Sequence, residues 1–101
     1  MAGKPWFLYL IECSDGSIYT GITVDVASRY AAHERGKGAR YTRSHPPRCL
    51  LAVIEYADRS AALRAECAMK KLSAAEKRTF ASGIPQKSKS PLVHLPPPDE
   101  V

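Results

Sequence analysis

The sequence LYLIECSDGSIYTGIT, residues 8–23, reads as two short apolar strands joined by a tight turn. The length of that turn decides on which face of the sheet its two tyrosines lie. With a two-residue turn at 15–16, Tyr9 and Tyr19 face opposite sides, because side chains alternate along a strand. With a three-residue turn at 14–16, they face the same side. Ser-Asp-Gly suits the longer turn, so we expect both phenols on one face.

The longer turn also fixes which residues pair across the hairpin. Gly16 would take the left-handed backbone conformation at the end of the turn. Ile11 would then lie opposite Tyr19, and Tyr9 would lie opposite Gly21, which leaves open space beside the phenol. The plain alternative is that both tyrosines are amphipathic sheet residues and that Gly21 only marks a bulge.

Apolar runs and turn residues divide the rest of the chain into short elements. The expected strands cover residues 6–12, 17–23 and 49–56, the expected helices 25–35, 60–72 and 73–82, and a Gly-, Pro- and Arg-rich loop covers 37–48. We therefore predict an α/β fold, a small three-stranded sheet whose first two strands form a hairpin, flanked by three helices. One domain is expected at residues 1–83, followed by a proline-rich, flexible tail at 84–101.

Composition narrows the class of protein. The formal net charge of +5 is a mild excess of Lys and Arg, which favours a polyanionic partner such as nucleic acid. Three cysteines form no C-x-x-C spacing, which argues against a disulfide framework and a zinc cage, and we expect each to be buried. No apolar run is long enough to span a bilayer, and no signal sequence is recognised. We expect a reducing, cytoplasmic location and no membrane.

Charged residues at two places stand out against this background. Arg29 and His33 lie four apart in the first expected helix and share one of its faces. Glu66 lies in LRAECAMKKL beside apolar residues, where a carboxylate is costly to bury unless a metal or cation meets it. The plain alternative is a solvated ion pair between Glu66 and Lys70.

Taken together, these residues resemble the GIY-YIG nuclease superfamily. FLY at residues 7–9 stands at the first strand motif and YTG at 19–21 at the second. RYAAH supplies Arg29 and His33, and RAE supplies Glu66. The resemblance spans residues 6–80, although the first motif lacks its glycine and the Asn of some members has no counterpart that we can place.

The resemblance implies hydrolysis of phosphodiester bonds in DNA with one divalent metal, Mg²⁺ or Mn²⁺. Glu66 would hold the metal, and either Tyr9 or Tyr19 would deprotonate or orient the attacking water. Arg29 would grip the phosphate. His33 would relay a proton or donate a hydrogen bond to a phosphate oxygen.

Residues near these positions are candidates for contact with nucleic acid. The segment GKGARYTR, residues 36–43, interleaves basic side chains with an aromatic ring, which suits a phosphate backbone and a stacked base. Gly21 would let the strand backbone approach the nucleic acid. The alternative is a solvated loop whose tyrosine packs on the domain. The candidates in this loop are Lys37, Arg40, Tyr41 and Arg43.

Two functions follow from the sequence. The first is a metal-dependent DNA endonuclease, selective for branched or single-stranded DNA and acting in repair or recombination. The second is a nucleic-acid-binding module with a vestigial or very weak catalytic site. A less favoured reading is an adaptor that uses the proline-rich tail.

Overall fold

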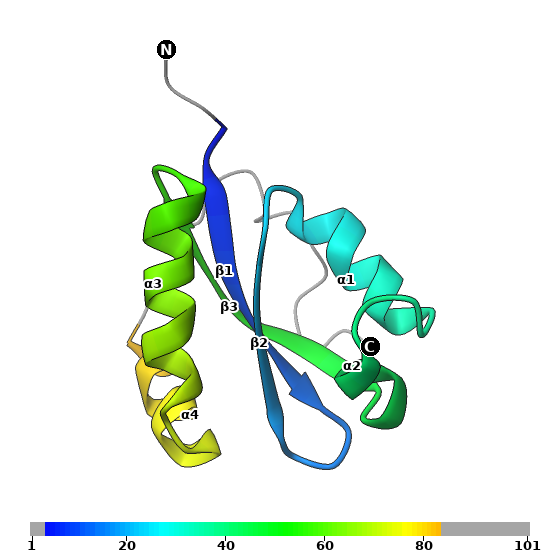
Figure 1. Cartoon of the computed structure of the whole chain (residues 1–101). Coiled ribbons are helices and arrows are strands. Elements are labelled where there is room, and N and C mark those ends of the chain that lie inside the picture. Colours follow the sequence, from blue (N-terminus) through cyan, green and yellow to red (C-terminus); the bar gives the residue numbers. More distant parts are fainter. Residues whose placement is uncertain (1–3, 84–101) are drawn as a thin grey trace.

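The computed structural model describes residues 4–83, in which three antiparallel strands pair in the order β2-β1-β3 (Figure 1). The first strand of the chain is therefore the central one. The strands are β1 (Trp6–Cys13), β2 (Ile18–Thr23) and β3 (Pro47–Tyr56); the helices are α1 (Val26–Glu34), α2 (Arg40–Ser44), α3 (Arg59–Lys70) and α4 (Ala74–Ser82). The predicted fold class is confirmed.

The hairpin has the three-residue turn. The backbone N–H of Cys13 donates to the carbonyl of Ser17 at 2.8 Å, and Gly16 has a φ of +90°. In the resulting register Tyr9 pairs with Gly21, and Ile11 pairs with Tyr19. Both tyrosines consequently lie on the same face of the sheet, as the turn chemistry predicts.

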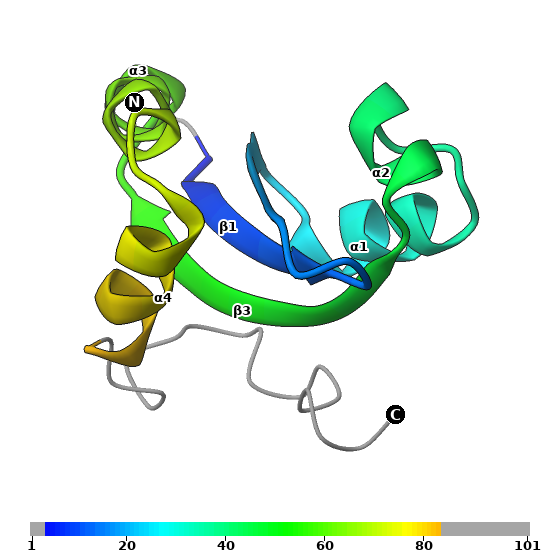
Figure 2. The same ribbon diagram turned by 90° about the horizontal axis from the view of Figure 1, so that it is seen from below.

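Helices cover both faces of the sheet (Figure 2): α1 and α2 lie on one side, α3 and α4 on the other. The continuous apolar run of β1 follows from this, since alternate residues of the central strand are buried in opposite halves of the core. On the α1 side the buried residues are Phe7, Tyr9, Ile11, Cys13, Val26 and Val53; on the α3–α4 side they are Leu8, Leu10, Ile18, Ala52, Met69 and Ala81.

Four details differ from the sequence predictions. The segment expected to be a loop at 37–48 contains the short helix α2, and β3 begins earlier, at Pro47. Helix α1 begins one residue later than expected, at Val26, because Asp25 is its N-cap: the Asp25 carboxylate accepts from the N–H of Ser28 at 3.1 Å. Cys67 is exposed, although the other two cysteines are buried as expected.

Three further features concern the start of α4, the membrane and the predicted tail. Helix α4 begins with a capping box formed by Ser73 and Glu76. Within residues 4–83, every helix is too short or too polar to cross a lipid bilayer. The predicted tail at 84–101 lies outside the described residues.

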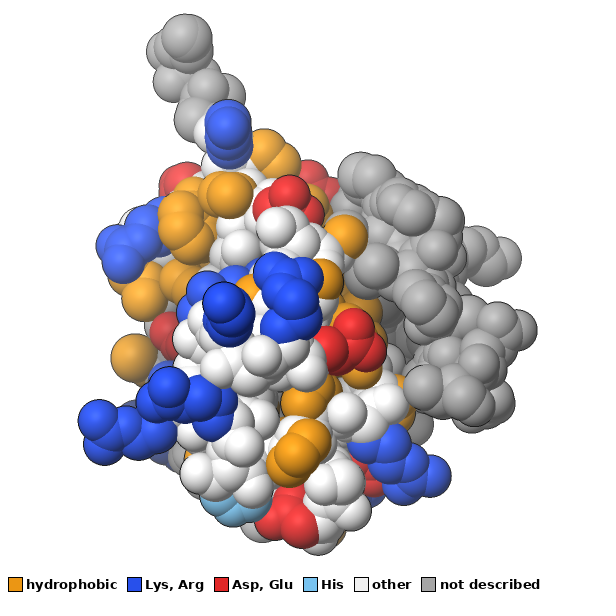
Figure 3. Space-filling model, turned by 90° about the vertical axis from the view of Figure 1, so that its right-hand side faces the viewer, with side chains coloured by type: hydrophobic (Ala, Val, Ile, Leu, Met, Phe, Trp, Pro, Cys, Tyr) orange, Lys and Arg blue, Asp and Glu red, His pale blue; other side chains and the backbone are white. Residues whose placement is uncertain are grey.

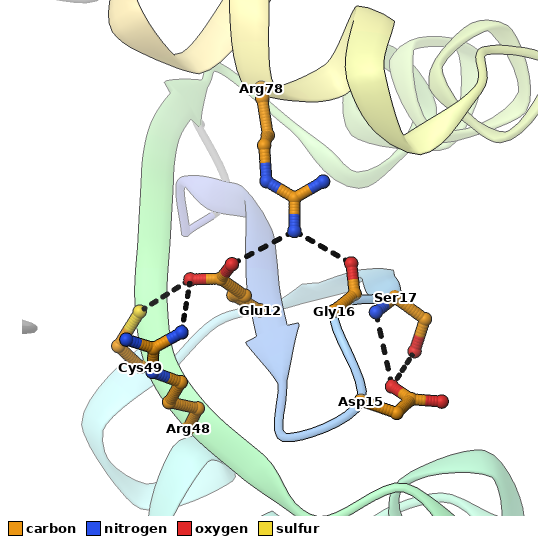
Figure 4. A network of polar contacts seen from close by, with 7 residues as sticks. All are labelled: Glu12, Asp15, Gly16, Ser17, Arg48, Cys49 and Arg78. Atoms are coloured by element: carbon orange, nitrogen blue, oxygen red, sulfur yellow. Dashed lines mark hydrogen bonds and ion pairs between the residues drawn. The ribbon is translucent and has the colours of Figure 1, made fainter.

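One polar network joins α4 to the turn of the hairpin (Figure 4). The guanidinium of Arg78 donates to the Glu12 carboxylate at 2.8 Å and to the carbonyl of Gly16 at 2.6 Å. This hydrogen bond is the main reason why the pKa of Glu12 lies below its ordinary value of 4.5. Since the Glu12 side chain is only 17% exposed, the contact is better shielded from solvent than a surface ion pair.

Replacing Arg78 by Met tests the strength of this network. The variant keeps a long side chain but loses the charge, so we expect the free energy of unfolding at pH 7 to fall by about 1–2 kcal/mol. A carboxyl group with a lowered pKa stabilises the fold above its ordinary pKa and loses that contribution as the pH falls through the folded value. Urea unfolding of the two proteins should therefore differ at neutral pH and converge in acid.

Arg48→Met is the matched control. Arg48 approaches the same carboxylate at only 3.9 Å, and its side chain is 67% exposed. Its loss should change the free energy of unfolding by less than about 0.5 kcal/mol. Equal losses for the two variants would contradict a specific role for Arg78.

Candidate active site

A buried phenol and a buried imidazole form the centre of the candidate site. Tyr9 comes from β1 and His33 from the last turn of α1, and each is only 1% exposed. The Tyr9 hydroxyl lies 3.0 Å from His33 Nε2. The ring of Tyr19 lies beside both, with centroids 6.2 Å from Tyr9 and 5.1 Å from His33. The hairpin and the following helix thus bring three predicted residues into contact.

The hydrogen bonds of Thr42 fix the orientation of this imidazole. Thr42, buried in α2, donates its hydroxyl proton to the carbonyl of Ala39 at 3.1 Å. Its oxygen lies 2.6 Å from His33 Nδ1, so it accepts from that nitrogen. A neutral imidazole carries one proton, and we therefore assign it to Nδ1. His33 Nε2 is then the acceptor for the Tyr9 hydroxyl.

Electrostatics keep His33 neutral at physiological pH. Burial is the main cause that lowers its pKa to about 4, and the positive charge of Arg29 adds to this effect. A neutral His33 can accept a proton from Tyr9 without first losing one of its own. The pair has the arrangement of a phenol next to a general base.

Charged residues from two helices act on the same phenol. Burial, followed by the nearby Tyr19, raises the pKa of Tyr9 to about 12. The guanidinium of Arg29 on α1 lowers this pKa, and the carboxylate of Glu66 on α3 raises it. The charges of both side chains thus act on the Tyr9 phenol, and that of Glu66 has the smallest effect of those named. Neutralising Glu66 would remove one of the effects that keep Tyr9 protonated.

Glu66 also forms the ion pair that the plain alternative predicted. Its Oε2 lies 3.3 Å from Nζ of Lys70, and the Glu66 side chain is 17% exposed. The carboxylate forms this ion pair and also acts electrostatically on Tyr9, and its place in the active site stays a prediction. Within residues 4–83, no three or more His, Cys, Asp or Glu residues lie together as a set of metal ligands.

Two glycines are required by the close packing of these rings. A Cβ on Gly21 would lie 2.5 Å from the Tyr9 hydroxyl oxygen and 2.6 Å from its Cζ. A Cβ on Gly38 would overlap the imidazole of His33. Gly21 therefore makes room for the phenol, while its expected contact with nucleic acid stays a prediction.

The predicted nucleic-acid-binding side chains lie around α2. Lys37, Arg40 and Arg43 are exposed, and Figure 3 shows that Lys and Arg side chains lie in several groups on the side of the molecule that carries α1 and α2. The side chain of Tyr41 is 38% exposed. Its ring stacks on that of His45 with the centroids 4.0 Å apart, and its centroid lies 6.0 Å from that of the Tyr19 ring. It thus packs next to the candidate site and keeps part of its surface open to solvent.

Two residues that shape the site, Thr42 and Gly38, are not recognisable in the sequence as site residues. Thr42 lies between Tyr41 and Arg43, which were interpreted as DNA contacts, and a single threonine in a presumed loop carries no signal of its own. Gly38 belongs to a segment where glycine is expected for flexibility. Only the helical turn of α2 shows that the two residues meet His33.

Comparison with known proteins places the chain among small bacterial relatives. A family model described as the GIY-YIG catalytic domain matches residues 5–79. A UPF0213 protein of Cupriavidus pinatubonensis is 51% identical over 82% of this chain and 92% of its own. A UPF0213 protein of Xanthomonas axonopodis pv. citri is 52% identical over 82% of this chain and 81% of its own.

A solved structure agrees with the fold. The solution structure of a protein from E. faecalis is 34% identical and superposes with a TM-score of 0.56. The match covers 81% of this chain and 88% of that one. The arrangement of the sheet and helices is therefore shared with a relative of known structure.

Gly21→Ala tests the packing of Tyr9. The added methyl group meets a ring that is buried on all sides, so we expect a loss of about 1–3 kcal/mol in the free energy of unfolding. Gly83→Ala is the control, because its Cβ would lie 3.6 Å from its nearest neighbour, an ordinary contact. Chemical denaturation of both variants checks the prediction, and a Gly21→Ala protein as stable as the control would contradict it.

The protonation of His33 can be followed by NMR. We expect its Cε1–H signal to titrate near pH 4. Between the ordinary pKa of 6.5 and that value, the unfolded chain binds a proton that the folded protein does not, so stability falls as the pH is lowered. His33→Asn should lose this part of the pH dependence. A midpoint near 6.5 in the folded protein would contradict a buried, neutral imidazole.

Proposed function

The chain belongs to the GIY-YIG family and to the UPF0213 proteins, and we propose that it is an endonuclease that hydrolyses phosphodiester bonds in DNA with Mg²⁺ or Mn²⁺. The family implies a nuclease and a DNA substrate. The observation that supports catalysis by this chain is the convergence on one phenol: His33, Arg29 and Glu66, from two different helices, all interact with Tyr9.

In the proposed reaction, Tyr9 or Tyr19 deprotonates or orients the attacking water, and the Tyr9 hydroxyl keeps its hydrogen bond to His33 Nε2. Thr42 keeps the Nδ1–H of His33 pointing away from the phenol, which leaves Nε2 free to accept. Tyr19, beside both rings, is the alternative base and otherwise positions the substrate.

Arg29 and Glu66 have complementary tasks. Arg29 neutralises the phosphate through its planar guanidinium and also lowers the pKa of Tyr9. Glu66 holds the divalent cation. A single carboxylate fits this role, because Mg²⁺ is commonly bound by one or two carboxylates together with waters and phosphate oxygens. When bound, the cation supplies Lewis-acid stabilisation of charge on the leaving oxygen.

The exposed basic residues of the α2 region would hold the DNA backbone beside this site. Lys37, Arg40 and Arg43 supply positive charge, and Tyr41 offers a ring to an unpaired base. We extend the proposal to branched or single-stranded DNA as substrate and to a role in repair or recombination. A cytoplasmic location, expected from the cysteine pattern, belongs to the same proposal.

The second candidate is a nucleic-acid-binding module with a very weak site. The ion pair between Glu66 and Lys70 favours it, because the carboxylate already has a cationic partner. This candidate predicts salt-dependent binding that survives the loss of Glu66, without any cleavage.

A cleavage assay separates the two candidates. Branched, flapped and single-stranded DNA are incubated with the protein in Mg²⁺ or Mn²⁺. We expect Glu66→Gln and Tyr9→Phe to slow cleavage by about a hundredfold or more, since general base and metal binding are each lost. Glu55→Gln, an exposed carboxylate on β3, is the matched control and should retain the rate.

Three results would decide against the endonuclease. The first is an intact DNA panel in both metals, and the second is a Glu66→Gln protein as active as Glu55→Gln. The third is binding to DNA without cleavage by the wild-type protein, which would favour the binding module.

A further inference from the structure

A pocket of about 280 Å³ lies at the edge strand β2, next to the candidate active site. Its volume is close to the lower end of small-molecule sites, about 300 Å³. Tyr19, one of its lining residues, also contacts His33 and Tyr9, and Lys70, another, is the ion-pair partner of Glu66. The complete lining is Ile18, Tyr19, Thr20, Tyr41, Lys70 and Lys77.

Lys77 is the unusual residue of this pocket. It is only 8% exposed, and none of the ion pairs found in residues 4–83 includes it. Its ammonium group donates one hydrogen bond, at 3.3 Å, to the carbonyl of Ile18. An ammonium has three donors, so two are left for another acceptor. Burying a cation whose donors are unused lowers the stability of the fold unless an anion binds to it.

Thr20 provides a second, independent sign of a missing partner. The residue is 2% exposed, and its hydroxyl has no hydrogen-bond partner within the described part of the chain. An unsatisfied buried hydroxyl costs about 1–3 kcal/mol. Lys77 has unused donors beside its bond to Ile18, and Thr20 has no partner within the described residues, so both can still donate to an oxygen acceptor in the pocket.

We propose that this pocket binds a phosphate group of the DNA strand, next to the phosphodiester held at Tyr9 and Glu66. The proposal rests on the proposed function, and it adds a contact that neither the metal nor the general base supplies. Lys77 and Lys70 neutralise the phosphate, and Thr20 hydrogen-bonds one of its oxygens. Tyr19 and Tyr41 contact the attached sugar or base. Binding of this phosphate fixes the register of the strand, and so determines which phosphodiester lies beside Tyr9.

The electrostatics of Lys77 agree with an anionic ligand. Its pKa is lowered, first by burial and then by the nearby charge of Lys70. A bound phosphate would offset both effects. The plain alternative is that Lys77 extends its methylene groups along the core and only caps the carbonyl of Ile18. That alternative predicts no effect of Lys77 on binding beyond that of any other lysine.

The test measures binding of a fluorescein-labelled octathymidylate in EDTA, where no cleavage occurs. Lys77→Met should weaken binding about tenfold, the effect of one charge-assisted contact. It should also reduce the slope of log affinity against log salt by about 0.7, the value for one phosphate on a single strand. Lys71→Met is the control: Lys71 is exposed at the end of α3 and does not line the pocket. It should change affinity less than twofold.

A second variant guards against misfolding. Thr20→Val removes the unpaired hydroxyl at nearly constant shape, so its Tm should stay equal to that of the wild type or rise. Its affinity should nevertheless fall about threefold, a loss that unfolding cannot explain. In NMR titrations with the same oligonucleotide, the amide signals of Ile18, Thr20 and Lys77 should shift.

The outcomes separate this inference from the endonuclease. If DNA is cleaved but Lys77→Met binds and cleaves like Lys71→Met, the pocket inference is wrong and the endonuclease stands. If no DNA is cleaved but binding depends on Lys77 and Thr20, the inference stands without the enzyme. Equal shifts with inorganic phosphate alone, and none with the oligonucleotide, would mean a free-anion site and would overturn it.

Discussion

The pairing of Tyr9 with Gly21 across the hairpin is the constraint on which the site depends. It seats a large ring over a residue without a side chain, so the phenolic oxygen reaches the edge strand although the ring is buried. The Tyr9 hydroxyl forms a hydrogen bond with His33 on one side of the sheet. The charge of Glu66, on α3 at the other side, raises the pKa of the same phenol. A shift of this register by one residue would put the two tyrosines on opposite faces of the sheet.

The central position of β1 has a second effect, because this strand serves two cores at once. Its alternate residues anchor α1 on one face and α3 with α4 on the other. The catalytic candidates lie on that shared strand, on β2 and on one helix from each layer. Their relative positions are therefore set by the packing of the whole domain rather than by a flexible loop.

Much of this arrangement was predictable, since its causes are local in the sequence. Ser-Asp-Gly dictates the turn, the turn dictates the register, and the helical spacing of Arg29 and His33 puts them on one face. The helix α2 was not predictable, because it is held by contacts made in the folded protein: Thr42 bonds to His33, and Tyr41 stacks on His45. The burial of Lys77 is likewise invisible in the sequence, where a lysine on a short helix is ordinarily solvated.

The bridge from Arg78 to the hairpin turn joins residues 66 and 62 positions apart in the chain. During synthesis, the residues of the hairpin leave the ribosome long before those of α4, the helix that contacts its turn. The register that positions the candidate site therefore lacks this contact until nearly all of the domain has been synthesised. Closing so large a loop is an event of high contact order, which makes the docking of α4 a late step in folding.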